Sequence, residues 1–431
     1  ANLTGQIFEM PAGWVGFATG VEVRQERGWR DPDQLTQMGI ANSNTQQRID
    51  GEYLAKEAYV ELAVPLLQEK PWAEALELNT ALRYSNYDLF GSDTNYKIGL
   101  DWQVTPSFKI RANHSTAFRV PNVPELYGGV SEGNLTTSDP CSNWSSRPSS
   151  DVVYQNCQAS GVPVGYTQLG NTILTTTGGN IELMPEDATT LTLGAVWTPG
   201  FADGLTLTLD YFDIKIENAI QSVAGSTKLS LCYNTPGLSH QFCDASNFTR
   251  NPVTGEVDFL SSQPVNAANE RVSGVDLGVL YEFKLASMDA TLNWDVSYLD
   301  RYEFTPYEGG ELIEYAGMIT GGRGSFTKWR SLGSLALAKG PWSGSYSVQY
   351  IGKADDINAE RGDIGDHAPS VSYHNAQVRF EFDEALSVAM GVDNIFNKQA
   401  PFIQSYTDAN TDTMTYDLLG RRMNMKINYR W

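Results

Sequence analysis

A strict alternation of apolar and polar residues, repeated along the chain, is the feature that most constrains how this sequence can fold. A period of two places alternate residues on opposite faces of a β-strand. In the last segment the apolar residues are Met423, Met425, Ile427, Tyr429 and Trp431, and the polar residues between them are Arg422, Asn424, Lys426, Asn428 and Arg430. Similar alternation occurs at 15–23, 58–64, 76–84, 96–104, 108–112, 191–197, 205–211, 275–283, 290–298, 342–350, 376–382 and 386–392. The sequence therefore predicts an all-β chain whose strands have one apolar and one polar face.

The composition fits such a two-faced sheet better than a thick soluble core. Hydrophobic residues make up 41% of the chain, aromatic residues 11%, and glycine occurs 39 times. The sequence has no apolar run long enough for a transmembrane helix. Its formal net charge of −21 argues against nucleic-acid binding, which requires a basic surface. Solvated acidic loops explain this charge more simply than attraction of a cationic ligand does.

The connections between the alternating segments are short and long in turn. Short ones lie at 65–71, 105–106, 199–204, 285–288, 339–340 and 383–384. Long ones lie at about 25–51, 119–187, 218–270, 300–324, 353–370 and 397–418, and the connection at 85–93 is of middling length. Antiparallel transmembrane barrels have short periplasmic turns and long extracellular loops. The chain is therefore predicted to be an antiparallel transmembrane β-barrel, although large lectin-like soluble sandwiches sometimes sort their loops similarly.

Counting one strand per alternating segment gives about fifteen strands. The first, Leu3–Met10, precedes a short turn and the last follows a long loop, so both are expected to run toward the periplasm. Because bacterial barrels have an even number of strands, further strands are expected before residue 1. The alternation changes phase within 205–217 and is irregular within 325–338. There we expect bulges or strand ends beyond the bilayer.

The four cysteines fall into two local pairs in loop-like sequence, Cys141 with Cys157 and Cys232 with Cys243. Four cysteines allow three pairings, and proximity in the sequence favours these two. Disulfides in exposed loops indicate an oxidising compartment. A metal site is the alternative, but neither pair has the spacing of a zinc motif.

Four short motifs resemble those of TonB-dependent outer-membrane receptors. Phe118-Arg119-Val120-Pro121 followed by Pro124-Glu125-Leu126-Tyr127 is similar to an "FRxP…EL(Y/F)" segment. Residues 179–186, GNIELMPE, resemble "GNPxLxPE", with Ile181-Glu182 as a mild departure. Residues 210–220 resemble a "DYxxIxIxnxI" strand, and residues 391–398 a "VxNLFdk" segment. The final Trp431 resembles the outer-membrane assembly signal. The motifs follow the expected order over residues 118–431.

This resemblance implies an active-import receptor in the Gram-negative outer membrane, in contact with its lipid. Such receptors have 22-stranded barrels with a plugged lumen. Residues 1–431 are then expected to be the C-terminal part of the barrel, with the plug, the TonB box and the first strands upstream. The TonB complex would act through that plug, and the imported solute would be an iron–siderophore complex, cobalamin or an oligosaccharide. No cofactor is implied. The motif residues expected to be structural are Arg119, Pro121, Glu125, Pro185, Glu186, Asn394 and Trp431.

The best ligand candidates are aromatic residues of the longest loop: Tyr127, Trp144, Tyr154 and Tyr166. Aromatic rings among Asn, Ser and Gln suit stacking on sugars or catechol groups, but they also simply pack a large loop. Nothing resembles an enzyme site or a metal site. Asp363, Asp366 and His367 fit a solvated loop better than a cation site. A passive porin-like or adhesin-like barrel is the alternative function, and a soluble lectin-like sandwich a third.

Overall fold

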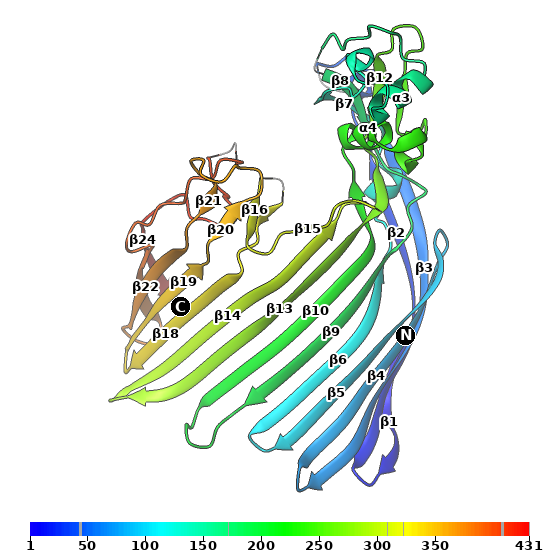
Figure 1. Ribbon diagram of the computed structural model, residues 1–431. Coiled ribbons are helices and arrows are strands. Elements are labelled where there is room, and N and C mark those ends of the chain that lie inside the picture. The colour runs from blue at the N-terminus through cyan, green and yellow to red at the C-terminus, as the bar shows by residue number, and fades with distance from the viewer. Residues whose placement is uncertain (43–44, 171, 308, 322, 407–408, 431) are drawn as a thin grey trace.

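The structure, a computed structural model, describes residues 1–42, 45–170, 172–307, 309–321, 323–406 and 409–430. Within these residues most strands belong to one curved, 16-stranded antiparallel sheet. Fifteen of them pair in chain order, and a short sixteenth pairs beside the path, which confirms the expected count of about fifteen. Figure 1 shows this sheet as a trough with its first and last strands at opposite edges.

The strands along the sheet run, in order, as follows: β1 Asn2–Met10, β2 Gly13–Arg30, β3 Ile49–Lys70, β4 Ala73–Tyr87, β5 Gly91–Thr105, β6 Phe108–Arg119, β9 Glu186–Trp197, β10 Leu205–Ser222, β13 Pro264–Leu285, β14 Met288–Thr305, β18 Trp329–Lys339, β19 Trp342–Ile351, β22 Val371–Glu381, β23 Leu386–Asp393 and β24 Arg422–Tyr429. β15, Ile313–Glu314, pairs with β14. Their connections are short at one end of the sheet and mostly long at the other, as predicted.

One predicted turn is wrong in its bounds. The connection expected at 65–71 is only two residues long, because β3 continues through Pro65 to Lys70. The pairing with β4 shifts register between Pro65 and Leu67. A proline cannot donate a ladder hydrogen bond, and a bulge tolerates that loss. The proline was therefore misread as the start of a turn.

The apolar rows are exposed rather than packed against a second sheet. On β24, the exposed fractions of Met423, Met425 and Ile427 are 79%, 60% and 59%. Rings gather where strands meet the short turns: Trp72 packs edge-on against Trp102, and Trp197 against Phe201. Aromatic girdles of this kind mark the interfaces of membrane barrels.

The opposite face carries ion pairs between strands. Arg111 of β6 makes two hydrogen bonds to Asp210 of β10, at 2.9 and 2.6 Å, across the intervening strand β9. Gly194 of β9 lies beneath this pair, and a Cβ atom there would stand 2.0 Å from the Asp210 carboxylate. The absence of a side chain at Gly194 therefore lets the ion pair cross the strand.

The change of phase in 205–217 is not a bulge at that point. β10 pairs with β13 in unbroken register from Leu205 to Ile216, and shifts only afterwards. Ile216 instead packs against a small core beyond the apolar band that includes Phe304 and Tyr315. The register therefore contradicts a bulge within 205–216, and a strand end beyond the bilayer stays a prediction.

The long connections form two further sheets at one end of the trough (Figure 1). One contains β7 Ser131–Thr136, β8 Thr172–Thr177, β11 Phe248–Arg250 and β12 Val257–Ser261. The other contains β16 Met318–Thr320, β17 Gly324–Ser325, β20 Ala354–Asp356 and β21 His367–Ala368. The helices are α1 Gln34–Gln37, α2 Val123–Tyr127, α3 Val152–Ala159 and α4 Gly225–Asn234, with 3₁₀ turns η1 Trp144–Ser146, η2 Pro236–Leu238 and η3 Gln241–Cys243. No helix in these residues is long and apolar enough to span a membrane.

Replacing Val378 of β22, which is 51% exposed on the apolar face, with arginine should impair insertion of the full-length protein. A charge on the lipid side of a barrel costs up to about 2–4 kcal/mol, depending on its depth in the bilayer. Urea unfolding in lipid vesicles measures this loss. Gln377→Arg, one residue earlier on the polar face, is the matched control and should cost far less. Equal losses in the two variants would contradict the assignment of the faces.

Candidate functional site

The connections between β6 and β9 and between β10 and β13 fold together into one unit, which we call the disulfide loop domain (131–177 and 223–263). Its sheet has the order β11-β12-β8-β7. β8 comes from the first connection and β12 from the second, and they pair in parallel through Thr175 and Leu260. Residues from both connections share one buried core. The two loops therefore form a single packed body.

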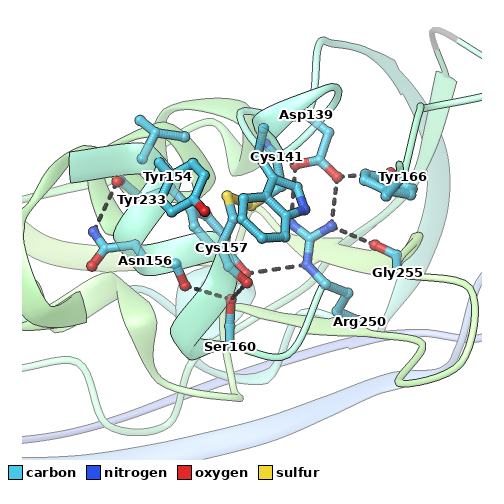
Figure 2. Close-up of a disulfide and its surroundings, with 12 residues drawn as sticks. Asp139, Cys141, Tyr154, Asn156, Cys157, Ser160, Tyr166, Tyr233, Arg250 and Gly255 are labelled. Atoms are coloured by element: carbon cyan, nitrogen blue, oxygen red, sulfur yellow. Dashed lines mark hydrogen bonds and ion pairs between the residues drawn. A yellow bond between two sulfur atoms is a disulfide. The ribbon is translucent and has the colours of Figure 1, made fainter. Parts of the chain in front are cut away.

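Both predicted disulfides are present. Cys141 pairs with Cys157, and Cys232 pairs with Cys243. Cys141 and Cys157 are fully buried among the aromatic rings of the core (Figure 2). The first disulfide fastens the segment before η1 to α3, and the second fastens α4 to η3. The cysteines thus tie irregular sequence into the core, and none is free among the described residues.

A buried ion pair joins the two loops beside the first disulfide. Arg250 donates to both carboxylate oxygens of Asp139, at 2.6 and 3.0 Å. The Asp139 side chain is 0% exposed and that of Arg250 is 9%. The hydroxyl of Tyr166 also donates to Asp139, at 2.8 Å, and the guanidinium lies 5.0 Å from the ring centre of Tyr233 (Figure 2). This network satisfies a charged pair that burial would otherwise make very costly.

The network also changes proton affinities. Burial alone would lower the pKa of Arg250, but its hydrogen bonds to Asp139 outweigh that effect and hold the pKa above the ordinary value. Burial, together with the nearby Asp139 carboxylate, raises the pKa of Tyr166. Arg250 and Tyr166 therefore both keep their protons throughout the physiological pH range.

The aromatic ligand candidates lie mostly inside this loop assembly. Trp144 and Tyr166 are buried in the core, with exposed fractions of 2% and 7%. Tyr154 is partly buried and packs edge-on against Trp144, with ring centres 5.0 Å apart. Tyr127 is partly buried and packs against a separate cluster below. The geometry favours the packing role for Trp144 and Tyr166, and it leaves parts of Tyr127 and Tyr154 accessible.

The motif residues at the base of the loop domain form a rim network. Arg119 donates to Glu186 at 2.6 and 2.9 Å and to Glu125 at 2.9 and 3.1 Å. Glu186 also accepts the backbone N–H of Ile220, and Glu125 completes the capping box of α2 with Asn122. One guanidinium thus connects the ends of β6 and β9, the start of α2 and the upper part of β10. Pro121 is buried and Pro185 partly buried beside this network.

Removing the rim guanidinium should loosen this base. In Arg119→Ala we expect segments 122–127 and 180–186 to lose about 1–2 kcal/mol of protection against hydrogen exchange, because the charge-assisted hydrogen bonds are lost. The loss is not larger because solvent screens the half-exposed guanidinium. Hydrogen exchange of the full-length protein measures the change. Lys215→Ala is the control, since Lys215 forms a single ion pair with Glu217 on β10, and both side chains are about half exposed. An equal effect of both variants would contradict the special role of Arg119.

Asn394 is buried in the turn that follows β23. It is 1% exposed with a left-handed backbone, φ 49°. Its side chain accepts from the Lys398 backbone N–H at 2.7 Å and donates to the Lys398 carbonyl at 2.9 Å. Trp431 lies outside the described residues. Asp366 pairs with His367 at 2.5 Å, and the described residues contain no group of three potential metal ligands.

Sequence reasoning missed Asp139, Arg250 and Lys228 of the loop domain. Each is a single charged residue with uncharged neighbours on both sides in the sequence. No local spacing signals a contact such as that between Asp139 and Arg250, which are separated by 111 residues. Charged residues are rarely buried, so nothing in the sequence placed these three in the interior of a folded domain.

Comparison with known proteins agrees with this architecture. A family profile described as "TonB dependent receptor-like, beta-barrel" matches residues 1–395. The chain belongs to this family. Membership of the TonB-dependent receptor family implies the Gram-negative outer membrane, and it sets the barrel among transport receptors rather than enzymes. No curated protein sequence matches the chain significantly.

Solved structures of similar fold are named as receptors or transporters. The ferric enterobactin receptor PfeA of Pseudomonas aeruginosa, in complex with enterobactin, has 17% identity and a TM-score of 0.63, covering 99% of this chain and 53% of PfeA. The siderophore receptor PirA of Acinetobacter baumannii has 15% identity and a TM-score of 0.60, covering 100% and 53%. The FrpB iron transporter of Neisseria meningitidis has 14% identity and a TM-score of 0.55, covering 99% and 53%. The receptor barrel described here therefore spans about half the length of the structures it matches.

Proposed function

We propose that this chain forms part of an outer-membrane receptor that actively imports a scarce, large solute. The proposal rests on the family match over residues 1–395, and the exposed apolar face of the sheet agrees with it. Among the candidate solutes, we favour an iron–siderophore complex over cobalamin and oligosaccharides. The names of the similar structures, an enterobactin receptor, a siderophore receptor and an iron transporter, support that order.

The proposed partners follow from the same family. A plug, a TonB box and further strands would precede residue 1, and the TonB complex would supply the energy for import through the plug. The edges of the sheet support further strands, because in the part of the chain that the structure describes β1 and β24 each pair with one neighbour. Unpaired backbone groups are very costly in hydrocarbon, and a closed barrel removes them.

The solute would first meet the loop domain and its neighbouring loops. Of the aromatic candidates, Tyr127 and Tyr154 retain accessible ring surface for stacking on a planar ligand. Trp144 and Tyr166 would instead hold the domain in shape. Tyr154→Ala is expected to weaken solute binding, whereas Tyr154→Phe, which keeps the ring, is expected to preserve it.

Uptake by the full-length protein tests the proposal. Cells expressing it would be offered ferric enterobactin, cobalamin or a maltooligosaccharide, with and without functional TonB. We expect one solute to accumulate above its external concentration, and this accumulation to vanish without TonB. Passage that is equal in both strains would refute active import and support a passive porin-like barrel instead.

A further inference from the structure

A cavity of about 420 Å³ lies beneath the disulfide loop domain, where the two loops meet the top of the sheet. Residues of α4, η3, the GNIELMPE segment and the start of β13 line it. The polar side chains that matter here are those of Lys228, Gln241, Asn247, Gln263 and Glu182. Phe242 adds an aromatic wall. The cavity therefore combines one buried cation with several amide groups.

Lys228 is the unusual member of this set. It is 1% exposed, yet its ammonium group makes only one long contact with a described residue, 3.5 Å from the backbone carbonyl of Gln263. The Phe242 ring centre is 5.6 Å away. An ammonium group has three donors, and among the described residues no carboxylate forms an ion pair with it. A buried charge without a partner is costly, which distinguishes Lys228 from the paired Arg250 nearby.

The proton stays on Lys228 at neutral pH. Burial lowers the pKa of the Lys228 ammonium to about 8, still above 7. The cavity thus presents a dehydrated positive charge. An apolar side chain of similar length would be the more stable choice at this position, and buried groups whose pKa is strongly shifted cluster at functional sites.

The neighbouring amides complement this charge. The side chains of Gln241 and Asn247 line the cavity and make no hydrogen bond with other residues in the described ranges. Their NH₂ groups can donate to an acceptor that Lys228 also contacts. Glu182 lines the cavity as well, but its side chain is exposed, so solvent screens its negative charge.

We propose that this cavity binds an oxyanion of the carboxylate or phosphate class, held by Lys228 with the amides of Gln241 and Asn247. The bound group would contact α4 and η3 from one loop and face the 179–186 segment from the other. It would therefore stabilise the junction between the loop domain and the barrel. This assignment does not depend on which solute the receptor imports.

Calorimetric titration of the detergent-solubilised, full-length protein with inorganic phosphate and with acetate, in chloride buffer, tests the site. We expect saturable binding of at least one of these two probes. Lys228→Met should weaken it by tenfold or more while increasing hydrogen-exchange protection of α4 in the absence of the probe. A purely structural lysine would show the opposite change in protection.

Lys284→Met is the matched control, because Lys284 is exposed at a short turn on the far end of the sheet. It should bind the probes as the unaltered protein does. Gln241→Ala and Asn247→Ala, which leave Lys228 in place, should each weaken binding severalfold and provide the test if Lys228→Met does not fold. Absence of saturable binding of both probes, or equal affinities in all variants, would overturn the proposal.

Discussion

Asp139→Asn should open the disulfide loop domain more than any other single substitution outside the cysteines. The variant leaves the Arg250 guanidinium buried without its counter-charge. Breaking one side of a buried ion pair typically costs about 3–5 kcal/mol. Residues 131–177 and 223–263 should therefore exchange their amide hydrogens faster as a block, whereas β18 and β19 of the sheet should not change. Hydrogen exchange of the full-length protein, followed by mass spectrometry, measures both regions together.

The double variant Asp139→Asn, Arg250→Met separates the two contributions to this loss. Removing both charges eliminates the unpaired cation, so part of the lost protection should return. Tyr166 also loses the carboxylate that accepts its hydroxyl, and that loss remains in both variants. The loss of hydrogen-exchange protection in the double variant could instead equal the sum of the losses in Asp139→Asn and Arg250→Met. The two side chains would then not be coupled, and the ion-pair argument would fail.

Loss of the disulfides should have a comparable effect by a different route. The Cys141–Cys157 and Cys232–Cys243 bonds close segments with sequence separations of 16 and 11 residues. A loop of this size contributes about 3 kcal/mol through the restricted unfolded chain, which corresponds to about a 100-fold change in the population of the open state. Reducing both bonds should thus make the loop domain the preferred site of proteolysis.

Limited proteolysis of the folded protein, with and without reductant, measures this change. Cleavage should fall within residues 131–177 and 223–263, and the barrel strands should remain intact. A variant with serine at all four cysteine positions is the control for the reductant, because its cleavage should be fast under both conditions. Unchanged resistance after complete reduction would show that packing of the core around Leu229 and Leu260 is sufficient.

The sheet was largely predictable from the sequence because each strand carries its own signal. The alternation in 376–382 and 386–392 identifies two strands, and the short connection between them identifies their antiparallel pairing. Pro65 misled the prediction because a bulge lets a proline sit inside a long strand. The disulfides were predictable for a similar reason, since their partners are close together along the chain.

The interior of the loop domain was not predictable in this way. Trp144 and Tyr166 looked like candidates for ligand contact because their sequence surroundings are polar, but long-range packing buries both of them. The parallel pairing of Thr175 with Leu260 has no periodic signature in short, irregular strands. Contacts of this kind depend on how the barrel brings two loops together, and only the three-dimensional structure contains that information.

The parallel pairing of β8 with β12 has a consequence for how this receptor surface can vary. Two loops that stand apart can each accept insertions and deletions independently. Here a change of length in either loop would shift the register of a sheet that both of them build. A change of length in one loop is therefore tolerated only if the strands of the shared sheet still pair. The outer surface should vary by paired changes in both loops or by exchange of the whole unit.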